Sequence, residues 1–255
     1  PMEAWNELIL KSLDDANVKA IFFVKGKGKY SDEGQYLLQS WNDRGHGIAN
    51  HTFNHPYFNN PKNDFITFED ELLRTDALIG QYSQYTKYFR FPYLKEGETP
   101  SKIDSIRQIL SANGYAHGHV TIDASDWYID MRLKNRLREN PKADVEGFKE
   151  FYLTHLFDRA TFYEKIAYEL TDRHIQHTLL LHHNLAAALF LDDLIAMFKE
   201  KGWNIVSAPT AYEDPIFQTK TIHAGESLIW AMAKDSGLYE KELRYPAEDS
   251  LYEEK

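Results

Sequence analysis

Hydrophobic residues along the chain alternate between helical and strand-like spacing. Trp5, Leu8, Ile9, Leu13 and Ala16 recur at three- and four-residue intervals, which predicts an amphipathic helix, and a buried strand is predicted over 19–24. The same reading predicts further helices over 36–41, 68–82, 103–110, 148–170 and 185–201, and strands that end at 51 or cover 88–91, 119–122, 178–181 and 203–206. Helices alternating with buried strands predict an α/β fold with a mostly parallel sheet.

Polar residues and glycines mark several helix ends. Glu69, Asp70 and Glu71 are expected in the first turn of the helix over 68–82, where negative charge is favourable. Asn113-Gly114 is typical of a helix C-terminus, and Gly202 is expected to close the helix over 185–201.

Composition narrows the possible partners. The 255 residues carry 43% hydrophobic and 27% charged residues, as in ordinary globular proteins, and no apolar run is long enough to span a bilayer. The formal charge of −10 disfavours nucleic acid and anionic membranes, and favours a neutral or cationic substrate. The one locally basic stretch, 132–142, is interpreted as a solvated helix face or loop. Because the chain has no cysteine, any metal site must use histidine and carboxylate ligands.

Two histidines four residues apart are the first candidates for chemistry. His51 and His55, followed by Pro56, can present both imidazoles on one side of a single turn. Neutral imidazole is a common ligand of zinc and similar ions, so the pair suggests a divalent metal site. Taken alone, the pair is better explained by a solvent-exposed or structural role.

Three further segments place polar residues directly after strand-like stretches. They are Arg90-Phe91-Pro92-Tyr93, Asp123-Ala124-Ser125-Asp126-Trp127 and Leu180-Leu181-His182-His183. The C-terminal ends of parallel strands meet at one edge of a sheet or barrel, and barrel-type enzymes carry their active residues at that edge. We therefore expect these segments to gather around the histidine pair.

In this order, the four segments resemble the polysaccharide deacetylase family, the NodB-like metal-dependent carbohydrate esterases. The resemblance covers residues 1–212 and implies a distorted (β/α)7 barrel of the polysaccharide deacetylase type. Residues 213–255 are then expected to form a C-terminal extension packed on the barrel, with one short helix over 227–237.

The resemblance also implies roles for the metal-binding and oxyanion-binding residues. His51 and His55 would bind the metal ion, which is expected to be Zn²⁺, with Co²⁺, Ni²⁺ or Mn²⁺ as alternatives. Arg90 would orient a catalytic aspartate. The turn at Pro92 would direct the backbone N–H of Tyr93 toward the oxyanion, an interaction typically worth about 3 kcal/mol of barrier.

The remaining roles concern the catalytic acid. By the same resemblance, Asp126 would hold and tune His182, which would protonate the leaving group. Trp127 is expected either to form a wall of the sugar-binding groove or to pack in the core. Asp123 is assigned only a supporting role, and His183 is the alternative to His182.

One motif of the family is not found in the chain. Relatives carry an aspartate pair within T/S-F-D-D, of which one aspartate is the general base and the other the third metal ligand. Asp14-Asp15 is no substitute, because it falls late in the first helix. We expect the pair, and with it the first strand of the barrel, to lie upstream of Pro1. The alternative is a relative that has lost catalysis.

These observations predict a hydrolase that removes acetyl groups from a polysaccharide or acetylated amino sugar through metal-activated water. The alternatives are a non-catalytic carbohydrate-binding relative and an amidase acting on a non-sugar substrate. The resemblance implies an exported protein, although the chain shows no signal peptide. The particular polysaccharide, N- versus O-deacetylation and the oligomeric state are left open.

Overall fold

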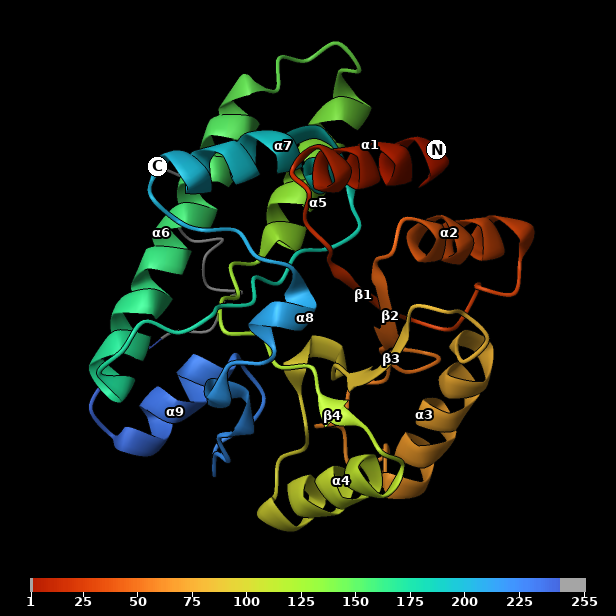
Figure 1. Ribbon diagram of the computed structural model, residues 1–255, viewed down its shortest axis with the longest axis vertical. Helices are drawn as coiled ribbons and strands as arrows, with labels where there is room; N and C mark the ends of the chain where they lie inside the picture. Colours follow the sequence, from red (N-terminus) through yellow and green to blue (C-terminus); the bar gives the residue numbers. More distant parts are fainter. Residues whose placement is uncertain (1, 244–255) are drawn as a thin grey trace.

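A parallel sheet of four strands forms one half of the molecule. The computed structural model describes residues 2–243, and its sheet has the order β1-β2-β3-β4 (Figure 1). The strands are β1 (Ile21–Val24), β2 (Gly47–Asn50), β3 (Tyr85–Phe89) and β4 (Ala116–His117), and each neighbouring pair is parallel. The predicted α/β class with a parallel sheet is therefore confirmed.

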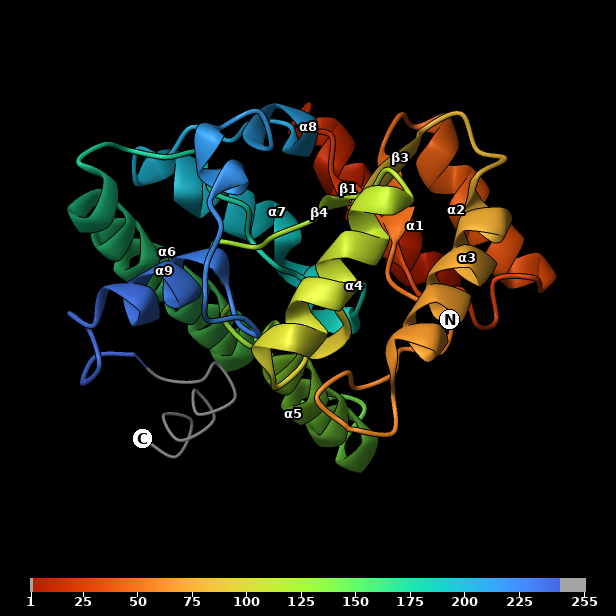
Figure 2. The ribbon, with the colours of Figure 1, turned by 90° about the horizontal axis from the view of Figure 1, so that it is seen from below.

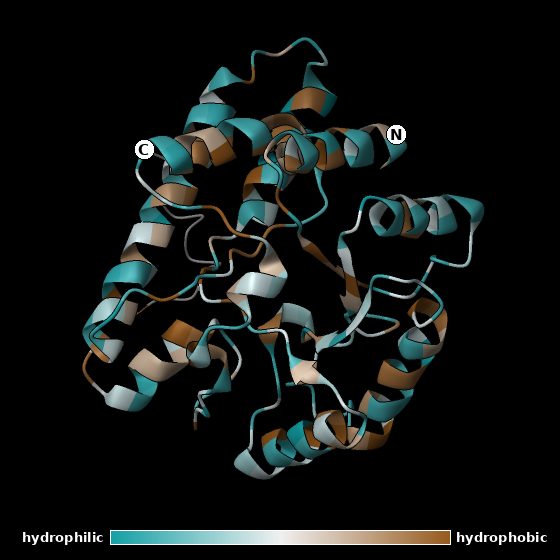
Figure 3. Cartoon of the chain, in the orientation of Figure 1, coloured by the Kyte–Doolittle hydropathy of each residue, from teal (hydrophilic) through white to brown (hydrophobic). Residues whose placement is uncertain are grey.

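Helices surround this sheet and build the second half of the molecule. Helix α7 (Leu185–Glu200) packs against α1 (Met2–Asp15), α5 (Asp126–Glu139) and α6 (Glu146–Thr171), and hydrophobic residues are spread through these helices in Figure 3. Figure 2 shows α9 (Leu228–Ser236) beside α6. The remaining helical segments are α2 (Asp32–Asp43), α3 (Phe65–Ile79), η1 (Pro92–Leu94), α4 (Pro100–Ala112), α8 (Ala208–Ala211) and η2 (Pro215–Gln218). No helix in the described range is both long and apolar enough to span a membrane.

Side-chain caps fix where several helices begin. Ser31, Asp64, Thr99, Asn184 and Ser227 each accept a hydrogen bond from a backbone N–H in the first turn of α2, α3, α4, α7 and α9, respectively. Because Asp64 is the N-cap, α3 begins at Phe65, three residues earlier than predicted. The expected acidic first turn at residues 69–71 is therefore wrong.

The second half of the predicted sheet is less regular than the sequence suggests. The segments 119–122 and 178–181 meet through a single bridge between Ile122 and Leu179, and 203–206 forms no strand. Strand structure depends on hydrogen bonding to a neighbour along a ladder. Within the described residues, 203–206 has no such ladder, so its hydrophobic pattern alone does not make it a strand. The helix α5 was not predicted.

Strand β1 lies at the edge of the sheet. Among the described residues it pairs only with β2, and its residues Ile21 to Phe23 are half-buried rather than buried as predicted. They line a cavity of about 1890 Å³ that extends to Leu179–Leu181, Trp203 and α7. Within residues 2–243, no further strand pairs with the outer side of β1.

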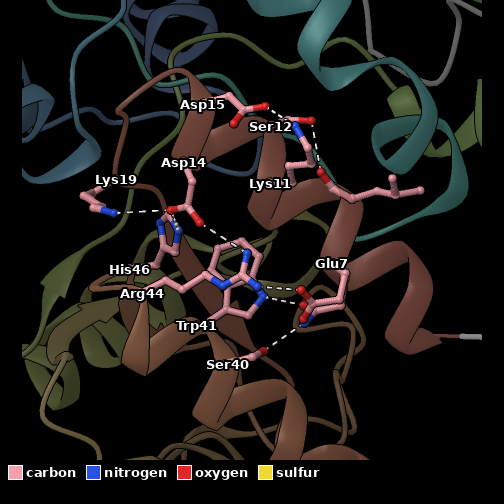
Figure 4. A network of polar contacts seen from close by, with 12 residues as sticks. Glu7, Lys11, Ser12, Asp14, Asp15, Lys19, Ser40, Trp41, Arg44 and His46 are labelled. Carbon is pink, nitrogen blue, oxygen red and sulfur yellow. Dashed lines mark hydrogen bonds and ion pairs between the residues drawn. The ribbon is translucent and has the colours of Figure 1, made fainter.

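A polar network joins α1 to α2 on the molecular surface. Arg44 reaches from the end of α2 to Glu7 and Asp14 of α1 (Figure 4), with 3.2 Å between its Nη1 atom and Oδ2 of Asp14. Asp15 pairs with Lys11 of the same helix. Asp14 and Asp15 are thus engaged in ion pairs at the surface, as expected for a pair that is not part of the site.

The C-terminal extension packs on the helical half over its described part, 213–243. Its helix α9 contacts α6. The helix begins after the N-cap Ser227 and ends before Gly237, so the short helix predicted over 227–237 is confirmed. The remaining residues of the expected extension, 244–255, lie outside the described range.

Candidate active site

The predicted metal-binding histidines lie in a loop that leaves the C-terminal end of β2. Thr52 and His55 both have left-handed backbone conformations, with φ of 64° and 66°. The two turns bring the imidazole centroids of His51 and His55 to 4.8 Å, edge to face. Nδ1 of His51 lies 2.7 Å from the carbonyl oxygen of Arg90, to which it donates, and Nε2 is then left as the possible metal-binding atom.

Buried polar side chains hold this loop in place. Asn50 accepts a hydrogen bond from the Thr52 N–H at 3.0 Å and donates to the hydroxyl of Tyr115 at 3.0 Å. The Tyr115 hydroxyl in turn donates to Asp76. On the other side, the buried Glu71 accepts hydrogen bonds from the backbone and side-chain N–H groups of Asn54. The loop is therefore preorganised by groups that the sequence motifs do not include.

Both imidazoles are in the form that binds metals. Burial lowers the pKa of His51 to about 3, and the neighbouring His55 adds to the effect. Burial also lowers the pKa of His55, with further contributions from the positive charges of Lys25 and His182. Near pH 7 both rings are neutral, which is the state that coordinates a divalent ion.

The predicted acid and its partner are in direct contact. Nδ1 of His182 lies 2.6 Å from Oδ1 of Asp126, while Oδ2 accepts the backbone N–H of His182 at 2.9 Å. Burial lowers the pKa of His182, but the charge and hydrogen bond of Asp126 outweigh it, so the pKa ends above 6.5. Such an imidazole can carry a proton near neutrality.

Helix α5 supplies two carboxylates, Asp126 and Asp130, that bind the segment between His182 and the start of α7. Sequence reasoning found only Asp126. Asp126 and Asp130 lie one helical turn apart, and Asp130 accepts the N–H groups of Leu185 and Ala186 at the start of α7. Asn184 donates to Asp126 at 3.1 Å. The i, i+4 spacing of the two aspartates was the available signal, but it required that α5 be recognised as a helix.

His183 points away from this pair. Its Nε2 atom lies 3.2 Å from Oδ1 of Asn6, and its ring lies near Phe22 and Trp41. Burial lowers its pKa to about 4, so the ring is neutral at pH 7. This environment suits a structural role.

The Arg90-Phe91-Pro92-Tyr93 segment forms a strained turn after β3. Tyr93 and Leu94 have φ of 56° and 58°, and the hydrogen bonds of the turn are donated by the N–H groups of Leu94 and Lys95. Among the described residues, the Tyr93 N–H is not used by the turn, as an oxyanion donor requires. The Tyr93 ring packs edge-on against His55 at 4.6 Å.

Arg90 has partners other than the one the resemblance implies. Its guanidinium donates to the Gly118 carbonyl at 3.0 Å and to the Tyr212 hydroxyl at 3.1 Å, and covers the Phe23 ring. Within residues 2–243 it forms no ion pair with a carboxylate, so orientation of a catalytic aspartate by Arg90 stays a prediction.

The Asp123–Trp127 segment lines the same cavity. Trp127 is 42% exposed in the first turn of α5, which fits a groove wall better than core packing. Burial raises the pKa of Asp123 to about 6, and the nearby carboxylates of Glu226 and Asp126 also raise it. A carboxyl group whose pKa is raised by burial is typical of functional sites, a property that the supporting role assigned to Asp123 did not anticipate.

One cavity thus collects most of the predicted site residues. His51, His55, Tyr93, Trp127 and His182 all line it, and Glu226 reaches it from the C-terminal extension. Glu226 is paired there with Lys95. The extension therefore contributes to the candidate site, although no chemistry was predicted from its sequence.

The donor atoms fit a divalent ion in type but not in number. His51 and His55 are adjacent, neutral and supported by hydrogen bonds, as metal ligands usually are. No group of three or more histidine or carboxylate side chains in residues 2–243 is arranged to hold a metal. Catalytic zinc usually has three protein ligands, of which these residues would supply two.

Comparison with known proteins relates the first part of this chain to the carbohydrate esterases of the polysaccharide deacetylase type. Residues 1–117 match the family model described as polysaccharide deacetylase. The resemblance predicted from the motifs is therefore confirmed: residues 1–117 are similar to the polysaccharide deacetylase family.

A curated relative and several solved structures are similar to this chain. A peptidoglycan-N-acetylglucosamine deacetylase of Bacillus cereus is 29% identical over 86 residues, which are 33% of this chain and 30% of that protein. A family 4 carbohydrate esterase pseudoenzyme of Bacillus anthracis aligns over 81% of this chain and 60% of its own, with 18% identity and a TM-score of 0.58. A family 4 carbohydrate esterase of Streptomyces lividans aligns over 81% of this chain and 88% of its own, with 18% identity and a TM-score of 0.53. The solved structures support the predicted barrel-type fold.

Proposed function

We propose that this protein is a metal-dependent deacetylase that removes acetyl groups from a polysaccharide or an acetylated amino sugar. The proposal rests mainly on one observation: the neutral pair His51 and His55 lines the same cavity as His182, which is held from behind by the buried Asp126. A divalent ion, when bound, would polarise the acetyl carbonyl and lower the pKa of bound water toward about 7. His51 and His55 would hold that ion, and zinc is the ion we propose.

The remaining chemistry is assigned to residues of the chain. The Tyr93 N–H, held by the strained turn after Pro92, would stabilise the developing oxyanion. His182, kept protonated by Asp126, would donate its proton to the leaving amine or alcohol. Trp127 would form a face of the groove against a sugar ring. Because the relatives' glycans belong to the cell wall, we also propose that the protein acts outside the cytoplasm.

Metal content and acetate release test the proposal together. We expect the purified chain to retain a divalent ion after dialysis, as measured by elemental analysis, and His51→Ala or His55→Ala to lose it. His182→Ala should retain the ion but release acetate from N-acetylglucosamine oligomers at least about a hundredfold more slowly. Circular dichroism controls for folding. Unchanged acetate release in both the His51→Ala and His182→Ala variants would contradict this assignment.

A second candidate function is a carbohydrate-binding relative that does not catalyse. Two observations favour it: the described residues supply only two metal ligands, and a pseudoenzyme is among the structurally similar proteins. Under this alternative, the chain would bind acetylated oligosaccharides, retain no metal after dialysis and release no acetate.

A further inference from the structure

Three lysines alternate with two glycines immediately after β1. The loop Lys25–Lys29 reads Lys-Gly-Lys-Gly-Lys, and its lysines line the cavity that also contains His51 and His55. Lys25 and Lys27 are exposed and Lys29 is half-buried. Across the described part of the chain, none of the three amino groups makes an ion pair. The three lysines therefore line the cavity without a direct ion pair among the described residues, while the charge of Glu33 acts on Lys29.

The lysine loop is fixed directly to the loop that carries the histidines. The N–H of Gly26 donates to the Thr52 carbonyl at 3.0 Å, and the N–H of Lys27 donates to the Phe53 carbonyl at 2.8 Å. A third bond, from the Lys29 N–H to the Gly26 carbonyl, closes the loop at 3.0 Å. These contacts place the lysines at the rim of the site through rigid backbone.

Both glycines are required by this geometry. A Cβ atom at Gly26 would lie 2.7 Å from the Phe53 ring and 2.8 Å from the Thr75 hydroxyl, and Gly28 has a φ of +84°. The backbone of the lysine loop therefore packs closely against the loop that carries His51 and His55. This packing fixes the position of the lysine backbone relative to the two histidines.

The charges within the loop favour an anion. Burial lowers the pKa of Lys29, the charge of Glu33 opposes that shift, and repulsion from Lys25 lowers the pKa by a smaller amount. An anion bound between these amino groups would relieve the repulsion and supply charge-assisted hydrogen bonds. The chain as a whole carries −10, so this local excess of positive charge is not a general property of its surface.

We propose that the Lys25–Lys29 loop binds a carboxylate carried by the sugar chain, so that the preferred substrate is an acidic acetylated polysaccharide. This inference rests on the proposed function and specifies its substrate class. It differs from the neutral or cationic substrate that the net charge predicts, because binding depends on the charges that line the site rather than on their sum over the chain.

The test compares one oligosaccharide in two charge states. An N-acetylated oligosaccharide bearing lactyl carboxylates, and the same compound after amidation of those carboxylates, are titrated calorimetrically into the chain at about 50 mM and about 300 mM salt. We expect about tenfold tighter binding of the carboxylate form at low salt. The preference should shrink at high salt. Equal affinity for the two forms would overturn the proposal.

Matched variants assign the preference to the loop. The triple variant Lys25→Gln, Lys27→Gln, Lys29→Gln should lose the preference, while Lys142→Gln, Lys199→Gln, Lys220→Gln should keep it. The control lysines are exposed and lie outside the cavity. If the loop triple does not fold, Lys27→Gln alone, at an exposed side chain, should reduce the preference at least about twofold. A preference that survives loop neutralisation would overturn the proposal.

Acetate release, measured on the same samples, separates this inference from the proposed function. Preferential binding without acetate release would support the carboxylate site and contradict deacetylation. Acetate release without preferential binding would support deacetylation and contradict the carboxylate site.

Discussion

The carboxylate of Asp126 contacts His182 twice, once at the imidazole and once at the backbone N–H. The distances are 2.6 Å from Oδ1 to Nδ1 and 2.9 Å from Oδ2 to the backbone nitrogen. The ring is therefore fixed in orientation as well as stabilised in its charged form. Because Asp126 is buried while the His182 side chain is 46% exposed, the proton-carrying ring faces the cavity and its counter-ion does not.

Asp126→Asn should lower the pKa of His182, since the variant keeps a similar shape but removes the negative charge. Less His182 would then be protonated at pH 7, and kcat should fall by about tenfold to a hundredfold. NMR titration of the imidazole and a pH–rate profile measure the two effects. In the wild type, the stabilising contribution of this pair is complete below about pH 6.5 and is lost as pH rises through the raised pKa of His182.

Asp130→Asn provides the control for that prediction. Asp130 lies one turn further along α5 and holds the start of α7, but it does not contact His182. An equal pKa shift in both variants would show that Asp126 acts on His182 through the fold and not through its charge.

Tyr115→Phe should weaken the support of the histidine loop. The change removes the hydroxyl that joins Asn50 to Asp76, and an unsatisfied buried group costs about 1–3 kcal/mol of unfolding free energy. Denaturant unfolding measures this loss, and metal content measures the effect on the loop. Tyr85→Phe removes the contacts of the Tyr85 hydroxyl with Asp76 and with the Tyr115 hydroxyl but keeps the bond from Asn50 to Tyr115. Equal metal content in the two variants would argue against support through Asn50.

Trp127→Ala should raise KM for an acetylated oligosaccharide by about tenfold, because a flat aromatic face against the sugar ring is lost. Stability should change little, since the side chain is already partly exposed. Tyr168→Ala removes an aromatic ring of similar exposure outside the cavity. An equal rise in KM in both variants would show that the effect of Trp127→Ala does not come from a contact with the sugar ring.

Asp214 makes a pH-dependent contribution to stability in the C-terminal part of the chain. Hydrogen bonds from Arg173 lower the pKa of Asp214 to about 2. Its contribution is therefore present above about pH 4 and lost as pH falls toward 2. Asp214→Asn should reduce the unfolding free energy by roughly 1–2 kcal/mol at pH 7 and by less at pH 2. Thermal unfolding at the two pH values measures the difference, and an equal loss at both would contradict the prediction.

The sequence was sufficient to predict the elements whose signals are local. Helical spacing and capping residues located α1, α4, α7 and α9. Strand patterns located β1 to β3, and His51 and Arg90 directly follow β2 and β3 in the sequence. The contact between Asp126 and His182, 56 residues apart, was expected only because the order of motifs resembled a family. Spacing within each motif carries no information about that distance.

Other features depend on packing that a local pattern does not record. The basic residues of 132–142 concealed the apolar face of α5, where Ile129 and Leu133 are buried, so this helix was not predicted. The segment over 203–206 has a strand-like composition but no neighbouring ladder in the described structure. The approach of Glu226 to Lys95 joins residues 131 positions apart. None of these was accessible from single-sequence periodicity.

Most of the left-handed non-glycine residues of the described chain lie at the site. Thr52, His55, Tyr93, Leu94 and Ser125 all have φ between 52° and 66°. Each such conformation costs about 1–3 kcal/mol that the surrounding structure must offset. The surrounding contacts therefore offset a local conformational cost that shapes this cavity. Glycine at these positions would relieve that cost but would remove side chains of the candidate site.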